Sequence, residues 1–198
     1  NKMLTRIYGL AFENETDLKA YEMQIEEAKK RDHRKLGAEL DLFTFSELVG
    51  PGLPLFTPKG TILRDTIIEK IAGIQKKFNY QKVTIPHITK AELYKTSGHY
   101  DKYGDDLFKV KGRGDAEFCI KPMNCPHHTQ IFASKPRSYK DLPLRYVETT
   151  TVYRDEQAGE LMSLSRVRAL SHVDGRRICR PDQLQEELKH IIHIIKQF

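Results

Sequence analysis

Two short runs of residues carry the strongest chemical signal in this sequence. They are Tyr153-Arg154-Asp155-Glu156 and Ser165-Arg166-Val167-Arg168. If each run is an extended strand, side chains two residues apart share a face, so the arginines of each run gather on one surface. Arginine binds phosphate through paired hydrogen bonds and keeps its charge at any working pH. Such a face suits a nucleotide, and Glu156 could accept a hydrogen bond from a nucleobase amine. A surface ladder of Arg–Glu ion pairs is the alternative interpretation.

The run Cys125-Pro126-His127-His128 is a second candidate, because cysteine and histidine can both bind zinc. A zinc site needs three or four ligands, so packing beside a helix start is the alternative. His190 and His193 also have ligand-like spacing, but they alternate with isoleucines, which favours the flank of a packed helix. The three cysteines form no C-x-x-C pair and predict a reducing setting rather than a disulfide framework.

Other catalytic motifs are absent from the sequence. There is no phosphate-binding glycine loop, no H-E-x-x-H motif and no nucleophile elbow. An enzyme built from this chain would therefore depend on positioning and on electrostatic stabilisation by arginines.

Length and charge set the class of protein. The chain has 198 residues, with 33 Lys and Arg against 27 Asp and Glu, so its net charge is +6. This balance permits contact with nucleic acid, and the apolar share of 39% argues against disorder. No apolar run reaches the roughly 18 residues of a membrane-spanning helix. A start at Asn1, with neither an initiator Met nor a secretory signal, predicts a fragment of a cytoplasmic protein.

The apolar periodicity predicts an α+β fold in which helices alternate with strands and hairpins. The first expected helix runs from Asn14 or Thr16 to Leu36, with Gly37 as the stop, and two shorter helices are expected over residues 90–97 and after Asn124. A long helix is expected over residues 61–78, with Thr61 as cap and an apolar stripe of Leu63, Ile67, Ile71, Ile74 and Phe78. The last expected helix starts at Pro181 and has Leu184, Leu188, Ile191 and Ile195 on one face. Expected strands cover residues 80–85, 107–110, 117–120, 144–154 and 165–172, the last two forming an antiparallel hairpin.

The two arginine-rich runs resemble motif 2 of the class II aminoacyl-tRNA synthetases, and helix 61–78 running into Val83-Thr84-Ile85-Pro86 resembles motif 1. More narrowly, several stretches resemble the threonyl-tRNA synthetase family. They are Leu4-Thr5-Arg6-Ile7-Tyr8-Gly9, Arg31-Asp32-His33-Arg34-Lys35-Leu36-Gly37, Lys95-Thr96-Ser97-Gly98-His99-Tyr100 and Cys119-Ile120-Lys121-Pro122-Met123-Asn124-Cys125-Pro126. The resemblance implies an antiparallel sheet flanked by helices, with residues 1–37 as a helical arm and 38–198 as the N-terminal part of the catalytic domain. It also implies a homodimer formed through motif 1.

This resemblance implies ATP-dependent activation of threonine, followed by its ligation to threonine tRNA, within a larger enzyme. Arg154 would hold the α-phosphate and the threonine carboxylate, where its fixed fork suits the charge of the transition state. Glu156 would meet the adenine amine, and Arg166 would reach the terminal phosphates of ATP. Mg²⁺ would share the phosphate charge.

The amino-acid pocket combines matches with departures from the family. Met123 and Asp174 match amino-acid-binding positions, and Cys125 matches the first of three ligands of a zinc ion that coordinates the amino group and hydroxyl of threonine. The second ligand is a histidine in the family but Arg176 here, and a guanidinium does not bind zinc. Either His172 substitutes as a ligand, or this chain binds no zinc.

Three further positions depart from the family. Leu170 stands where an adenine-stacking Phe is often found, Val173 replaces a usual Asp, and His127 replaces a usual Gly. Leu170, His172, Val173 and Arg176 support an alternative, a degenerate synthetase-like protein that binds a nucleotide or RNA without activating threonine. A general RNA-binding domain is a weaker alternative, because the basic residues are spread out. The sequence stops before the family's third zinc ligand and motif 3, and it shows no editing or anticodon-binding domain, which implies a partial catalytic domain.

Overall fold

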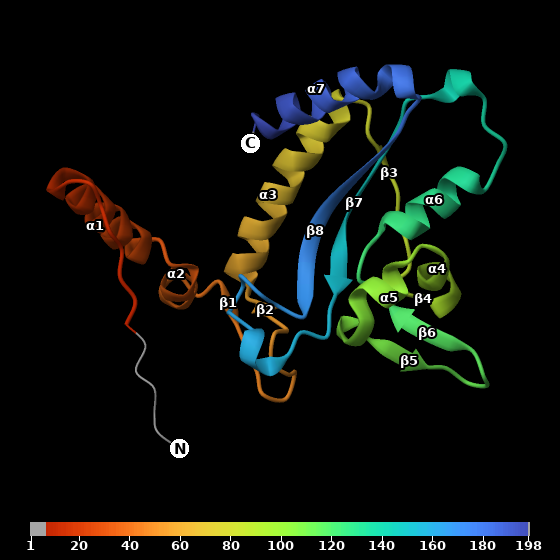
Figure 1. The fold of residues 1–198 in the computed structure, drawn as a ribbon. Coiled ribbons are helices and arrows are strands. Elements are labelled where there is room, and N and C mark those ends of the chain that lie inside the picture. The colour runs from red at the N-terminus through yellow and green to blue at the C-terminus, as the bar shows by residue number, and fades with distance from the viewer. Residues whose placement is uncertain (1–6, 198) are drawn as a thin grey trace.

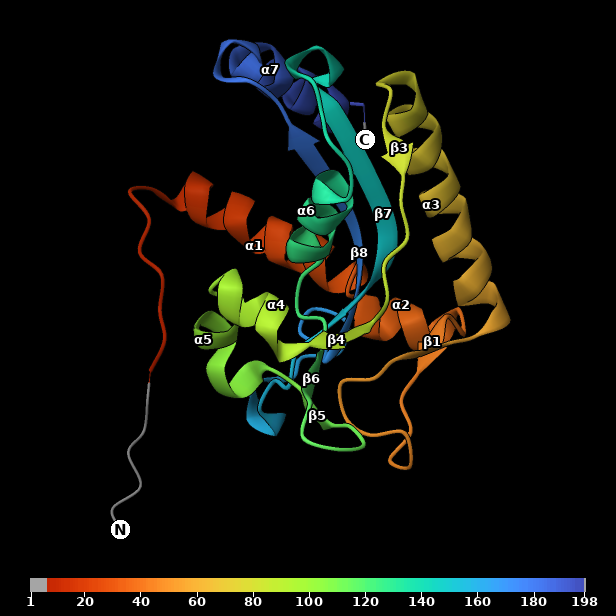
Figure 2. The same cartoon turned by 90° about the vertical axis from the view of Figure 1, so that its right-hand side faces the viewer.

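Two long strands form the centre of the structure, a computed structural model that describes residues 7–197. β7 (Leu144–Tyr153) and β8 (Ala169–Ile178) pair antiparallel, and β3 (Gln81–Lys82) joins β7 in parallel. Figures 1 and 2 show this sheet lying between α3 (Pro58–Lys77) and α6 (Cys125–Ala133). The predicted α+β class, a largely antiparallel sheet flanked by helices, is confirmed.

β3 is much shorter than the strand predicted over residues 80–85. Beyond its two residues, the chain stays beside β7 through the N–H of Val83, which donates to the carbonyl of Val147. The N–H of Ile85 then donates to the side chain of Glu148 at 2.9 Å. A buried carboxylate therefore takes the place of a ladder hydrogen bond and ends the strand.

A second, smaller sheet has the strand order β4 (Ile88–Lys90), β6 (Glu117–Ile120), β5 (Lys109–Lys111), with both pairings antiparallel. α4 (Ala91–Thr96) packs on it, and α5 (His99–Tyr103) follows. A buried apolar cluster joins them, made of Ala91, Tyr94, Leu107 and Cys119. The predicted helix over 90–97 and strand over 117–120 are confirmed. The strand predicted from Leu107 begins at Lys109, because Leu107 packs into the cluster instead.

The N-cap of α3 lies four residues earlier than predicted. It is Thr57, whose hydroxyl accepts a hydrogen bond from the N–H of Gly60 at 3.2 Å, and Pro58 occupies the first turn. Thr61 is therefore inside the helix. The predicted apolar stripe is only partly buried: Ile74 is buried, whereas Ile67 is exposed.

The long helix predicted to end at Leu36 is wrong in its continuity. α1 (Glu15–Lys30) stops at Lys30, and Asp32 caps a new helix, α2 (His33–Glu39), by accepting from the N–H of Arg34 at 2.8 Å. The predicted cap at Asn14 is confirmed, since its side chain accepts from the N–H of Asp17. Gly37 lies inside α2 rather than ending it. A Cβ there would come within 2.3 Å of the Phe43 ring, so the glycine allows close packing.

The hairpin was predicted correctly in its pairing but not in its second strand. β8 runs over Ala169–Ile178 instead of 165–172, so Arg166 and Arg168 precede the strand. The backbone N–H groups of Arg168 and Ala169 both donate to the carbonyl of Gly52. An outside loop therefore takes the hydrogen bonds that a longer β8 would have used.

The final helix, α7 (Leu184–Ile195), follows a short turn and lies across one end of β7 and β8 (Figure 1). The predicted packed face is wrong for Leu184, Leu188 and Ile195, which are exposed. Ile191 is half-buried, and the buried residues are Glu187 and Ile194. Glu187 faces the sheet because Arg145 and Arg177 hold its carboxylate, the latter at 2.7 Å. Ion pairing by Glu187, together with the buried Ile194 on the same face, therefore sets the rotation of this helix.

The remaining elements are short. They are β1 (Phe43–Thr44), β2 (Leu55–Phe56) and single helical turns at Gly104–Asp106, Tyr139–Asp141, Ala158–Glu160 and Pro181–Gln183. Within residues 7–197, no helix combines the length and apolarity needed to cross a membrane.

Candidate functional site

One face of the β7–β8 pair forms the floor of the candidate site. The register places Thr150 opposite His172, Glu148 opposite Asp174 and Tyr146 opposite Arg176. Because strand side chains alternate, these six residues share the face toward α6. Two contacts agree with this: Lys121 Nζ donates to Thr150 Oγ1 at 2.8 Å, and His128 Nε2 lies 3.6 Å from Glu148 Oε2.

Arg154 comes directly after β7 and lies at the end of this face of the sheet. Its guanidinium lies over the Tyr103 ring, 5.2 Å from the ring centre, and its Nη2 atom is 3.8 Å from Met123 Sδ. The Met123 segment is held there by the carbonyl of Lys121, which accepts from the N–H of Tyr153 at 2.9 Å. Among the described residues no carboxylate pairs with Arg154, and its buried Nε has no partner. Its charge is therefore available to an anionic ligand.

Arg166 and Arg168 are engaged within the protein. Arg166 donates to the Glu156 carboxylate at 2.8 Å and also pairs with Glu160 at 2.9 Å. Arg168 donates to the backbone carbonyl of Glu156 at 2.8 Å and lies 3.5 Å from Asp155. The Arg–Glu ion pairs raised as an alternative are thus present for Arg166, whereas Arg154 lies apart from them. Arg154, Arg166 and Arg168 line a hollow of about 90 Å³, which can hold a few water molecules.

Glu156 is only 7% exposed, which is unusual for a glutamate. Arg166 satisfies part of its carboxylate, and a carboxylate offers about four acceptor positions. Glu156 lines the hollow, as does Leu170. The residue is thus fixed in place and still has capacity to accept from a further donor.

Cys125 begins α6, and its Sγ lies 3.2 Å from Nε2 of His99. The His99 ring in turn stacks on Tyr103, with 6.2 Å between ring centres. Burial raises the pKa of the Cys125 thiol, and the nearby positive charge of Arg176 opposes that shift. Sequence reasoning missed His99 as a site residue. The signal available was its place after Gly98, in a run that resembles the family.

A zinc ion does not fit these residues. In the part of the chain that the structure describes, no three His, Cys, Asp or Glu side chains gather closely enough to hold a metal. Cys125 has His99 as a neighbour, and His172 does not complete a set with them. Arg176 offers no lone pair, because a guanidinium has only N–H donors.

Asp174 and Met123 lie on the same side of the site as Cys125. The charge of Asp174 acts on both the Cys125 thiol and Lys121, and its buried Oδ2 has no hydrogen-bond partner among residues 7–197. The Met123 carbonyl accepts from the hydroxyl of Tyr94 at 3.0 Å. The fold therefore brings Arg154, Met123, Cys125 and Asp174 into one site, with Glu156 and Arg166 at its outer end.

Several polar residues beneath the site are buried, and the sequence did not predict their burial. Lys121, Asn124, His128 and Glu148 are all nearly inaccessible to solvent. Burial lowers the pKa of Lys121, and nearby Glu148 and Asp174 oppose that shift. Burial likewise lowers the pKa of His128. No local sequence pattern marks these residues as a group, because they come from β7, from α6 and from the segment that precedes α6.

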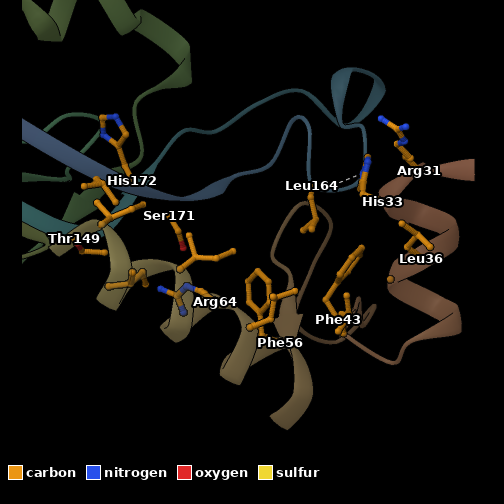
Figure 3. Close-up of a pocket in the computed structure, with 18 residues that line it drawn as sticks. Arg31, His33, Leu36, Phe43, Phe56, Arg64, Thr149, Leu164, Ser171 and His172 are labelled. Atoms are coloured by element: carbon orange, nitrogen blue, oxygen red, sulfur yellow. Dashed lines mark hydrogen bonds between the residues drawn. The ribbon is translucent and has the colours of Figure 1, made fainter. Parts of the chain in front are cut away.

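A larger cavity of about 440 Å³ lies on the opposite face of the sheet, between α2, α3 and β8. Figure 3 shows Ser171 pointing into this cavity and His172 pointing away from it, as strand alternation requires. Its lining is mostly apolar, including Phe43, Phe56 and Ile67. Of the predicted site residues, only His172 borders this cavity, so the cavity is separate from the candidate site.

Comparison with known proteins gives a consistent result. Residues 108–198 match the family described as "tRNA synthetase class II core domain (G, H, P, S and T)". The chain is 52% identical over 197 residues to the threonine–tRNA ligase of Cytophaga hutchinsonii and 54% identical over 198 residues to that of Flavobacterium psychrophilum. Each alignment covers 98% of this chain and 30% of the relative.

Solved structures agree with the sequence relatives. The structure titled as the RNA-binding domain of threonyl-tRNA synthetase from Cryptosporidium parvum Iowa II matches with a TM-score of 0.79 and 36% identity, covering 84% of this chain and 42% of that one. Prolyl-tRNA synthetase of Giardia lamblia matches with a TM-score of 0.67 at 22% identity, covering 73% of this chain and 30% of that one. The second match shows a shared fold.

Proposed function

Because this chain belongs to the threonine–tRNA ligase family and carries part of its class II core, we propose that it helps to activate threonine with ATP and transfer it to threonine tRNA. The chain spans about 30% of the length of the curated relatives it matches. The activity is therefore proposed for the larger enzyme, to which this chain would contribute ATP-binding and amino-acid-binding residues.

Arg154 is the observation that carries this proposal. It is a guanidinium with no carboxylate partner among residues 7–197, fixed over Tyr103 and beside Met123. An uncompensated arginine in a partly buried place is costly unless an anion binds there. When the carboxylate of an amino acid attacks the α-phosphate of ATP, negative charge builds up on both groups in the transition state. The planar guanidinium offers several N–H donors and can bind the carboxylate and the phosphate together. Arg154 would hold these two groups in line.

The outer residues would hold the rest of the nucleotide. Glu156 is fixed by Arg166, so its free acceptor positions suit an exocyclic amine of adenine. Arg166 is shared between Glu156 and Glu160, and terminal phosphates would compete with Glu160, the more exposed partner. Mg²⁺ bound with ATP would offset part of the triphosphate charge. Met123 and Asp174 would line the threonine side of the site.

Substitution of Arg154 tests the proposal. In the full-length protein, Arg154→Ala should lower threonine-dependent ATP–pyrophosphate exchange by at least about 10²-fold, since one preorganised donor is worth that much to a charged transition state. Arg113→Ala removes an exposed arginine in the turn between β5 and β6 and serves as the matched control. Exchange that survives Arg154→Ala at the control level would remove the basis for this role.

Domain organisation and assembly follow as further parts of the proposal. Residues 1–37 would form an arm and residues 38–198 the N-terminal part of the catalytic domain. None of the α1 residues is buried, which supports an arm. Exposed apolar residues on α3, Ile62 and Leu63 among them, support pairing of two copies through this helix. Three free cysteines support a cytoplasmic location.

A second candidate function is nucleotide binding without threonine activation. Arg176 and Leu170 favour it, because the amino-acid pocket and the adenine side both depart from the family pattern. The same exchange assay separates the two functions. ATP binding without any threonine-dependent exchange in the unaltered enzyme would favour this second candidate.

A further inference from the structure

The amino-acid side of the site contains a cation that belongs to the protein itself. Arg176 lies on β8 opposite Tyr146, on the face toward α6. Its positive charge and a hydrogen bond from its side chain oppose the rise that burial causes in the pKa of the Cys125 thiol. Its position in the sequence is that of a zinc-binding histidine in the family it resembles. A guanidinium therefore lies close to Cys125, the one residue here that matches a zinc ligand of the family.

Two buried polar atoms on this face have no hydrogen-bond partner among the described residues. They are Nε of Arg176, a donor, and Oδ2 of Asp174, an acceptor. The two residues are two positions apart on one strand, so their side chains point to the same side. Buried groups of this kind are rarely left unsatisfied. A ligand that carries both a donor and an acceptor would satisfy them together.

A metal would not satisfy them. Of the family's zinc-ligand positions that fall within this chain, only Cys125 keeps a side chain that can bind metal, and a divalent cation there would meet repulsion from the guanidinium of Arg176. An α-amino acid with a side-chain hydroxyl does carry the required pair. Its ammonium can donate to Asp174, and its hydroxyl oxygen can accept from Arg176.

We propose that this chain's amino-acid subsite works without zinc, with Arg176 and Asp174 together binding the hydroxyl and ammonium of the substrate. This inference rests on the proposed function for the identity of the substrate as threonine. Its metal-free character rests only on the residues present. Rejection of hydroxyl-free valine would then come from an unpaired buried donor rather than from an empty coordination position.

Metal content of the full-length protein tests the inference directly. After expression with added zinc and dialysis, elemental analysis should find less than about 0.1 zinc per chain. Arg176→His should raise this to about one, because it restores the family's ligand beside Cys125. Arg113→His, an identical change at an exposed turn, should leave the metal content unchanged. Cys125→Ser combined with Arg176→His should lose the gained zinc.

Threonine binding supplies the second readout. Calorimetry on protein treated with a zinc chelator should show threonine binding that Arg176→Ala weakens at least about tenfold, the effect of one charge-assisted hydrogen bond. Arg113→Ala should leave threonine affinity unchanged, and Arg176→Ala should change valine affinity little.

Three results would overturn the inference: about one tightly held zinc in the unaltered protein, no zinc gained by folded Arg176→His protein, or unchanged threonine affinity in Arg176→Ala. Absence of threonine-dependent exchange in the unaltered protein, with the metal results as expected, would instead contradict the proposed function and leave the zinc-free subsite supported.

Discussion

Single residues in this chain differ in role according to whether their charge is already paired. Arg154 has an aromatic ring and a thioether beside it, whereas Arg166 has two glutamates. The three arginines of the two runs look equivalent in the sequence, yet only Arg154 lacks a carboxylate partner among residues 7–197. The ion pairs formed within the protein therefore distinguish Arg154 from the other two arginines.

Glu187 is the clearest case of a residue whose charge is structural. Its carboxylate is 4% exposed and is held by Arg145 and Arg177. Glu187→Gln should lower the free energy of unfolding by about 3–5 kcal/mol, because it leaves two poorly accessible guanidiniums without a counter-charge. Urea denaturation of the full-length protein measures this. Glu186→Gln, on the exposed side of the same helix, should change stability by less than about 0.5 kcal/mol; equal effects of the two variants would contradict the assignment.

The same residue predicts an acid dependence. Hydrogen bonds from Arg145, together with the charges of both arginines, lower the pKa of Glu187 from 4.5 to about 2. A lowered pKa means that the folded state favours the ionised form, so the stabilisation is complete above pH 4.5 and is lost as the pH falls toward 2. Unfolding curves at a series of pH values should therefore be flatter for Glu187→Gln than for the unaltered protein across this window. Parallel curves would argue against it.

At the scale of elements, glycines decide where helices can approach other segments. A Cβ at Gly60 would lie 1.8 Å from the backbone carbonyl oxygen of Leu42, and backbone cannot move aside cheaply. Gly73, in the same helix α3, has nothing within 4 Å. The first glycine is therefore required by packing, and the second is not.

Alanine substitutions should separate these two glycines. Gly60→Ala should destabilise the protein by several kcal/mol, since the start of α3 must shift away from Leu42. Gly73→Ala should stabilise it by about 0.5–1 kcal/mol, since alanine favours a helix interior over glycine. Thermal unfolding midpoints should move in opposite directions. Midpoints that move together would show that helix propensity, not contact, governs both sites.

Element boundaries were predicted well where local chemistry controls them. Asn14 caps α1, and residues 117–120 form β6, because capping and strand patterns act within a few residues. The second strand of the hairpin was misplaced, because Gly52, more than a hundred residues away in the sequence, takes the hydrogen bonds of Arg168 and Ala169. Local patterns contain no information on such a partner.

At the scale of the whole molecule, α1 stands apart from the packed elements. Figure 2 shows it extending away from α3, and none of its residues is buried. α3 instead lies along the central sheet and buries Ile74. The two helices should therefore contribute very differently to the stability of the fold around the central sheet.

Proline substitutions at exposed alanines test this difference. Ala20→Pro in α1 and Ala72→Pro in α3 each remove a helix hydrogen bond, at a local cost of about 3 kcal/mol. In α1 the cost should stay within the arm, with the unfolding midpoint of the core changing by less than about 2 °C. In α3 it should lower that midpoint by several degrees. Hydrogen exchange of the β7 and β8 amides at a series of temperatures reports on the core, and an equal fall for both variants would show that α1 is packed.

The family, the α+β class and most helices were determined by the sequence alone, because motif spacing, capping residues and apolar periodicity are local properties. The grouping of Arg154, Met123, Cys125 and Asp174 was only a prediction drawn from resemblance until the fold placed them on one side of the sheet. Tertiary structure alone decided which charges are paired. Arg166 is engaged by Glu156, Glu187 turns α7 toward the sheet, and Arg176 lies beside Cys125. Charge pairing acts through space and depends on burial, so no pattern along the chain records it.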